Sequence, residues 1–106
     1  MVNVRIVELQ ENITNEVEFP IFSGKFLVKN WSDDEVLFNY TDNFPNSDGY
    51  DPNDAPVIVG SMLAENIEYN ERNWSNTTEQ ACRVYLQGKG KVEIRMLSWS
   101  YTELMM

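Results

Sequence analysis

The amino-acid sequence predicts an all-β protein, a single-domain β-sandwich or jelly-roll-like barrel of about seven or eight short antiparallel strands. Three observations support this class. Apolar residues recur at every second position in several short stretches, which is typical of strands with one buried face. Turn-forming Gly, Pro, Asn and Asp separate these stretches, and no segment carries apolar residues at helical spacing. At 106 residues and 42% hydrophobic composition, the chain suits one domain over residues 1–106.

The first strands are expected in the amino-terminal half. Period-two alternation marks the stretches 2–6, 17–21, 26–29 and 35–40. In the last of these, Val36, Phe38 and Tyr40 share a face, which predicts that they point into the core. Pro20 interrupts the second stretch and favours an edge strand or a strand end there.

The carboxyl-terminal half contains the clearest local pattern. Residues 57–59 resume the sheet, and Ile67 with Tyr69 extends it or pairs with it. Residues 81–86 and 92–97 flank Gly88-Lys89-Gly90, which predicts a β-hairpin with a tight turn. Its buried side is expected to bring together Cys82, Val84 and Leu86 with Val92, Ile94 and Met96.

A long acidic loop is expected at residues 41–56, which contain three Pro, one Gly, four Asp and three Asn. Its oxygen-rich side chains make it a candidate calcium loop. The candidate ligands are Asp42, Asn46, Asp48, Asp51 and Asp54. The EF-hand spacing fails, because Gly49 at the sixth position would place Phe44 first and Ala55 twelfth. The alternative is a solvated cluster of Asx turns, which this mismatch favours.

Charge is distributed unevenly along the chain. Residues 33–71 hold ten of the seventeen carboxylates and no Lys or Arg, whereas the rest holds seven carboxylates and all eight cations. This distribution argues against nucleic acid as a ligand. It favours a basic protein surface, a cation, or solubility alone.

The composition also limits the chemistry that is possible. The chain has no His, so the usual general base and the commonest metal ligand are missing. The lone Cys82 is expected to be a small buried hydrophobe. We therefore expect no catalytic residue, no metal and no cofactor. Without a signal-peptide pattern or an apolar run of about 20 residues, we expect no membrane partner.

The end of the chain is the candidate partner-binding region. Trp99 and Tyr101 alternate with serines, and Leu104, Met105 and Met106 form an apolar terminus. Such residues favour a contact with another chain. A frayed terminus is the alternative for the last residues. A sugar-stacking platform is a further alternative for the aromatic residues Trp31, Trp74, Trp99, Tyr50, Tyr69 and Tyr101.

Three segments carry a resemblance to a known group of proteins. They are residues 2–7 (VNVRIV), 23–30 (SGKFLVKN) and 84–94 (VYLQGKGKVEI). Together they resemble small phage and prophage structural proteins, which are β-sandwich accessory components of the virion, such as head decoration or tail-associated subunits. The resemblance implies assembly in the host cytoplasm, a place in the virion and no cofactor. The acidic loop at 41–56 departs from this pattern.

These observations lead to one main functional expectation and two alternatives. The main expectation is a non-enzymatic virion protein that binds a capsid or tail protein, as a homo-oligomer or as symmetric copies on a lattice. The first alternative is an acidic cytosolic inhibitor that mimics nucleic acid, with affinity that falls steeply with salt. The second is a carbohydrate-binding module.

Overall fold

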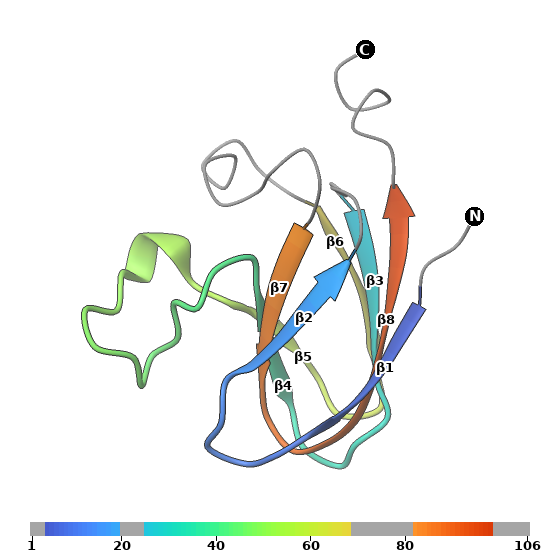
Figure 1. The fold of residues 1–106 in the computed structure, drawn as a ribbon. Helices are drawn as coiled ribbons and strands as arrows, with labels where there is room; N and C mark the ends of the chain where they lie inside the picture. Colours follow the sequence, from blue (N-terminus) through green and yellow to red (C-terminus); the bar gives the residue numbers. More distant parts are fainter. Residues whose placement is uncertain (1–3, 20–24, 69–81, 99–106) are drawn as a thin grey trace.

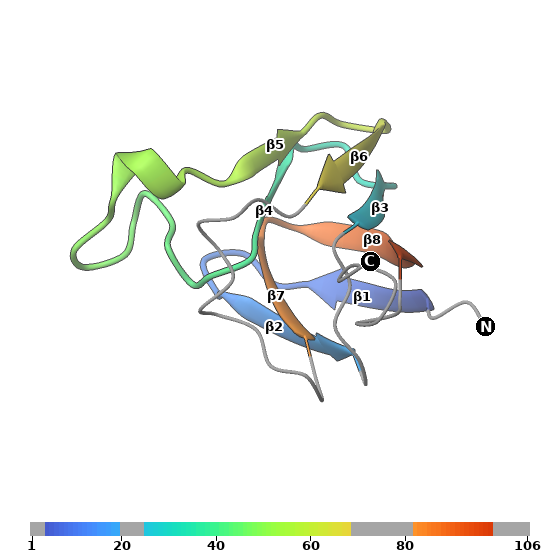
Figure 2. The ribbon, with the colours of Figure 1, turned by 90° about the horizontal axis from the view of Figure 1, so that it is seen from above.

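The computed structural model describes residues 4–19, 25–68 and 82–98, and these form a sandwich of two four-stranded antiparallel sheets (Figures 1 and 2). Sheet A contains, in spatial order, β1 (Val4–Leu9), β8 (Gly90–Ser98), β3 (Lys25–Asn30) and β6 (Ala64–Glu68). Sheet B contains β2 (Asn15–Phe19), β7 (Cys82–Gln87), β4 (Val36–Asn39) and β5 (Val57–Val59). The all-β sandwich is thereby confirmed. No helix among the described residues is long and apolar enough to cross a membrane.

The strand pairing is that of a jelly roll. β1 pairs with β8, β2 with β7, β3 with β6, and β4 with β5. This nested order results when one long antiparallel ribbon is rolled up, and the β8–β3 and β7–β4 pairs then join its turns into two sheets. Consecutive strands therefore lie in opposite sheets, except for β4 and β5.

The predicted hairpin at the carboxyl-terminal end is wrong, because β7 belongs to sheet B and β8 to sheet A. The chain crosses between the sheets at Gly88-Lys89-Gly90. Gly90 has φ 97°, and a Cβ there would lie 2.6 Å from Cβ of Ser32, so the crossing requires glycine. The predicted apolar faces are correct for the described side chains, but they meet across the core rather than along one ladder. These side chains are Val84, Leu86, Val92, Ile94 and Met96, all buried.

An aromatic cluster lies at the centre of the core. The ring of Phe26 lies 5.1 Å from that of Phe19 and 5.9 Å from those of Phe38 and Tyr40, centroid to centroid. Phe19 and Phe38 come from sheet B and Phe26 from sheet A, so the cluster joins the two sheets. Tilted rings at these distances stabilise the packing beyond the area they bury. The predicted inward face of Val36, Phe38 and Tyr40 is confirmed.

In edge strand β1 the side chains alternate between the two faces, but the expectation that the alternating apolar residues of 2–6 form a buried face is wrong for its described residues. Ile6 is 64% exposed on the outer side of sheet A. Arg5 pairs with the buried Ile94 and therefore lies on the inner side, with its guanidinium carbon 4.9 Å from the centroid of the Phe19 ring. An inward-pointing charge on an edge strand opposes further strand addition and stacks on an aromatic ring.

The long loop between β4 and β5, which projects to one side in Figure 1, is organised by hydrogen bonds and one buried ring. Phe44 is fully buried. The Asn39 amide donates to the carbonyls of Asn43 (2.9 Å) and Asp54 (3.0 Å), and the Asn43 amide donates to those of Asp51 and Asp54 (2.8 Å each). A short 3-10 turn, Pro52–Asp54, lies within it. The loop is therefore a folded element with an acidic surface.

The burial of Phe44 generates a testable prediction about this loop. Replacing Phe44 by Ala should lower the free energy of unfolding by about 3 kcal/mol, because a fully buried ring is lost and a cavity remains. Urea denaturation followed by tryptophan fluorescence measures the change. Asp48→Ala, at an exposed position in the same loop, is the control and should change stability by less than about 0.5 kcal/mol. Equal effects of the two substitutions would contradict the anchoring role of Phe44.

Candidate functional site

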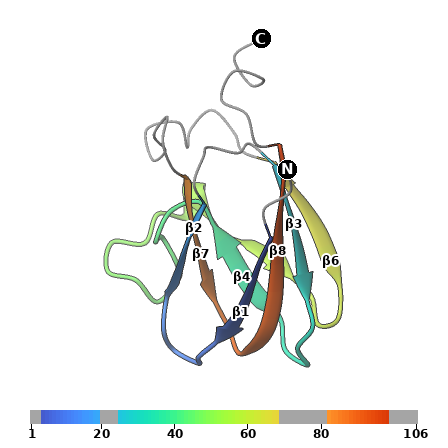
Figure 3. The ribbon, with the colours of Figure 1, turned by 45° about the vertical axis from the view of Figure 1, so that its right-hand side comes forward.

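Four strand connections meet at one end of the sandwich, the lower end in Figure 3. They are residues 10–14, 31–35, 60–63 and 88–89, which join β1–β2, β3–β4, β5–β6 and β7–β8. We call this region the loop end. It brings together segments that are far apart in the sequence, which follows directly from the rolled ribbon.

Asn30, at the end of β3, organises two of these connections. It is only 2% exposed. Its side-chain NH2 donates to three carbonyls, those of Asp34 (2.8 Å), Val59 (3.1 Å) and Gly60 (3.1 Å). Its side-chain oxygen accepts from the N–H of Ser32 (2.9 Å), and its backbone N–H donates to the carbonyl of Leu63 (2.8 Å). The β3–β4 and β5–β6 connections are therefore held together through one buried amide.

Three large apolar side chains are exposed on these two connections. Trp31 is 52% exposed, and Met62 and Leu63 are each 60% exposed. With parts of Lys29, Asn30 and Ala64 they line a hollow of about 100 Å³. We call Trp31, Met62 and Leu63 the loop-end patch. Its backbone is fixed by hydrogen bonds from the N–H of Trp31 to the carbonyl of Lys91 (3.0 Å) and from the Ser61 hydroxyl to the carbonyl of Ser32 (3.0 Å).

Backbone strain in the loop end occurs at Met62. Asn12 (φ 67°) and Met62 (φ 59°) are the two non-glycine residues with positive φ in the described part of the chain, and both lie here. Each occupies the third position of a four-residue turn, closed by bonds from Ile13 N–H to the Gln10 carbonyl (3.3 Å) and from Leu63 N–H to the Gly60 carbonyl (3.1 Å). Gly and Asn are the usual residues at such a position. Asn12 fits this preference and Met62 does not.

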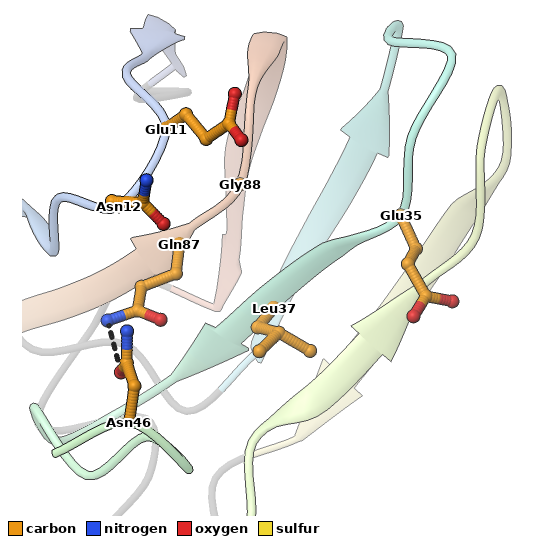
Figure 4. A pocket seen from close by; sticks show the side chains of 7 residues that line it. All are labelled: Glu11, Asn12, Glu35, Leu37, Asn46, Gln87 and Gly88. Atoms are coloured by element: carbon orange, nitrogen blue, oxygen red, sulfur yellow. Dashed lines mark hydrogen bonds between the residues drawn. The ribbon is translucent and has the colours of Figure 1, made fainter.

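Polar hollows surround the crossing from β7 to β8. Figure 4 shows one of about 250 Å³, with Glu11 and Glu35 contributed by different connections and a 3.0 Å hydrogen bond from the Gln87 amide to Asn46. A second, of about 280 Å³, lies beside the patch. Its lining consists of Trp31, Ser32, Asp33, Asp34, Lys89, Gly90 and Lys91. Trp31 thus separates an apolar hollow from a polar one.

The acidic stretch of the sequence includes residues of both connections that carry the patch, and the whole of the long loop. Between residues 33 and 68 the described chain holds nine carboxylates and no Lys or Arg. Among the cations, Lys29 and Arg95 lie 3.5 Å from Glu93 on sheet A, so their charge is partly compensated. The hollow next to the patch combines Asp33 and Asp34 with Lys89 and Lys91, so the surface beside Trp31 carries both signs of charge.

A cluster of charged and polar side chains lies on the outer face of sheet B, away from the loop end. The hydrogen bond from Arg83 to Glu18 (3.1 Å), with the charges of Glu16 and Glu18, raises the pKa of Arg83. Partial burial, then the hydrogen bond to Glu16 (3.2 Å), raises the pKa of Tyr85. Since Glu18 pairs with Arg83 and Glu16 with Tyr85 across the strands, these contacts support the β2–β7 register. Exposed pairs of this kind add little to stability.

Three of the five candidate calcium ligands accept hydrogen bonds within the protein, and the other two have exposed side chains. The Asp51 carboxylate accepts from the N–H of Asn53 (2.9 Å) at the start of the 3-10 turn, and that of Asp54 accepts from the Thr41 hydroxyl (2.8 Å). Asn46 accepts from Gln87, and Asp42 and Asp48 are exposed. Within residues 4–19, 25–68 and 82–98, no three His, Cys, Asp or Glu side chains are grouped so as to hold a metal ion.

The sequence-predicted partner-binding residues lie outside the described residues. They are Trp99, Tyr101, Leu104, Met105 and Met106. Trp31, which the sequence suggested as part of an aromatic platform, is described and exposed, but Trp74 lies outside the described residues. Met62 and Leu63 were not predicted. The available signal was two large apolar residues directly after Gly60-Ser61, a turn in which apolar side chains are unusual.

Comparisons with known proteins give no relative from which a function could be transferred. No protein-family model matches the sequence, and no curated protein or solved structure matches it. A jelly roll hosts many unrelated functions, so a function has to be inferred from the residues of the loop end and not from the fold.

The hydrogen bonds of Asn30 predict a large effect of a small substitution. Asn30→Ala should lower the free energy of unfolding by about 2 kcal/mol, because buried carbonyls lose their donor. Urea denaturation measures the loss. Asn66→Ala, at an exposed position on β6, is the matched control and should change stability by less than about 0.5 kcal/mol. A cost no larger than that of the control would contradict the organising role of Asn30.

The placement of the acidic loop side chains predicts that calcium does not stabilise the protein. The melting temperature should be the same in millimolar Ca²⁺ and in chelator, because a cation that binds only the folded state would raise it. Differential scanning calorimetry measures both values. A rise in calcium that disappears in Asp48→Asn would instead show that the loop binds the ion.

Proposed function

We propose that this chain is a non-enzymatic structural protein of a phage virion, which binds a capsid or tail protein as a decoration, minor head or tail accessory subunit. The observation that carries the proposal is the loop-end patch, in which Trp31, Met62 and Leu63 are more than half exposed on a backbone fixed by hydrogen bonds. A contiguous apolar surface rimmed by polar residues is typical of a protein interface.

The composition and rigidity of the patch support a binding role. Trp and Met are enriched at protein interfaces, and Trp is also enriched among the residues that dominate binding energy. Because Asn30 holds both connections of the patch in place, little conformational freedom is lost on binding.

A sequence resemblance and the fold, in addition to the patch, support the assignment to a virion. Residues 2–7, 23–30 and 84–94 resemble small phage structural proteins. The jelly roll is also common in viral capsid proteins, although this is an analogy at the level of fold. A virion subunit of this kind is present in symmetric copies, with charge complementarity guiding each copy to a basic site.

Mass spectrometry of density-banded virions from the source phage tests the proposal. The chain should be found in many copies per particle. Deletion of residues 101–106, which include Leu104, Met105 and Met106, should reduce incorporation while circular dichroism shows an intact fold. Recovery of the chain only in the soluble lysate would contradict the proposal. A partner bound there with strongly salt-dependent affinity would favour the inhibitor instead.

A further inference from the structure

We infer that a groove around the crossing from β7 to β8 binds a neutral oligosaccharide, with one sugar ring stacked on Trp31. This binding activity goes beyond the proposed function and does not depend on it. Three features of the described residues support this ligand: the continuity of the groove, the charge of both signs along it, and the exposed indole at one end.

Three hollows that are open to solvent join to form the groove. The middle one, of about 320 Å³, shares Asp34 and Lys89 with the hollow beside Trp31. It shares three further lining residues, Glu11, Glu35 and Gly88, with the hollow drawn in Figure 4. The groove therefore runs from Trp31, past the crossing, to Leu37 and Gln87, which pair on the outer face of sheet B. Because it leaves one side of a ligand exposed, it suits a chain of linked units better than a small molecule that must be enclosed.

Hydrogen-bonding side chains line the groove along its length. Its charged groups are the carboxylates of Glu11, Asp33, Asp34 and Glu35 and the ammonium groups of Lys89 and Lys91. Within the described part of the chain, none of these six groups forms an ion pair or a side-chain hydrogen bond. The amide of Asn12 adds a group that both donates and accepts. The groove thus presents donors and acceptors that the protein itself does not use.

The combination of charges favours a ligand rich in hydroxyl groups. A hydroxyl donates to a carboxylate and accepts from an ammonium group, so it is matched to both kinds of side chain. Four carboxylates and two ammonium groups give the groove a net charge of −2. This charge disfavours nucleic acid and acidic polysaccharides, which the carboxylates repel. Lys89 and Lys91 in turn disfavour a polycation, so a neutral oligosaccharide fits best.

Trp31 supplies the apolar surface on which a sugar ring can stack. It is 52% exposed and lines the polar hollow at the end of the groove. The C–H groups on one face of a sugar ring pack against the flat indole and are attracted weakly by its π system. The N–H of Trp31 donates to the Lys91 carbonyl (3.0 Å), which fixes the residue before a ligand binds. Met62 and Leu63 do not line this hollow, so the groove and the loop-end patch share only Trp31.

The test measures binding of the purified full chain to an array of immobilised neutral and anionic oligosaccharides. Neutral members should bind. For the strongest of them, isothermal titration calorimetry should give an affinity that rises about tenfold from the monosaccharide to the tetrasaccharide, because the longer ligand fills more of the groove. Equal affinity for both lengths would overturn the groove as the site.

Variants of the apolar residues locate the stacked ring. Trp31→Ala should weaken binding of the same tetrasaccharide about tenfold, whereas Trp31→Phe should retain most of it, because an aromatic face remains. Ile6→Ala is the matched control, since Ile6 is 64% exposed on the outer side of sheet A. Met62→Ser should also leave binding unchanged. A loss in Met62→Ser equal to that in Trp31→Ala would place the ligand on the loop-end patch and overturn the inference.

A carboxylate pair tests the middle of the groove. Glu35 lines two of the three hollows, so Glu35→Ala should weaken binding severalfold. Glu65→Ala is the matched control, because Glu65 is exposed on β6 and does not line the groove. Equal effects of the two substitutions would overturn the path of the ligand along the groove.

The remaining outcomes concern the class of ligand. If no neutral oligosaccharide binds, the inference is overturned. If only sulfated or other anionic oligosaccharides bind, and Lys89→Ala weakens this while Trp31→Ala does not, the contact is electrostatic and the inference is also overturned. The virion proposal fails separately, when the chain is absent from banded virions, so either proposal can be overturned without the other.

Discussion

The pairing of the first strand with the last is the constraint on which the rest of the structure depends. β1 lies beside β8, and the other pairs are nested within this one down to β4 and β5. Neither sheet is complete until segments from both ends of the chain have met, so folding must close loops over almost the whole sequence. The same nesting brings four connections to one end of the sandwich. The loop end is thus a consequence of topology, and no local sequence feature creates it.

Two buried asparagines donate hydrogen bonds to backbone carbonyls at places where the chain leaves a sheet. Asn30 and Asn39 are the buried polar residues of the described core, and each donates to carbonyls where the chain leaves a sheet. Asn30 joins the patch connections, and Asn39 holds the start and end of the acidic loop together. A carboxamide suits both places because it donates and accepts without bringing a charge into a buried position. The loop end and the long acidic loop are therefore shaped by neutral amides, and carboxylates are displayed outside them.

The sequence predicted well what depends on neighbouring residues and less well what depends on distant ones. Alternation identified the strands and the inward face of Val36, Phe38 and Tyr40, since both follow from local periodicity. The glycines at 88 and 90 predicted a hairpin, but the same residues also suit a crossing between sheets, and only the partners of β7 and β8 distinguish the two. The buried role of Asn30 was not predictable, because two of the three acceptors of its side chain, the carbonyls of Val59 and Gly60, lie far from it in the sequence. For the patch, Trp31 was noted as an aromatic residue, whereas the position of Met62 and Leu63 directly after Gly60-Ser61 was a signal that was not used.

Met62 is informative when it is compared with Asn12, because both occupy a turn position with positive φ and only Asn is a usual residue there. A position that requires positive φ is filled by Asn in one turn of the loop end and by Met in another, so the difference lies in the side chain and not in the backbone geometry. Strain without a benefit to folding is expected where function requires a particular residue. Exposure of the same side chain adds a second cost, since an apolar surface in water favours unwanted association. Both costs fall at a point that Asn30 holds in place through its hydrogen bonds to the carbonyls of Asp34 and Gly60.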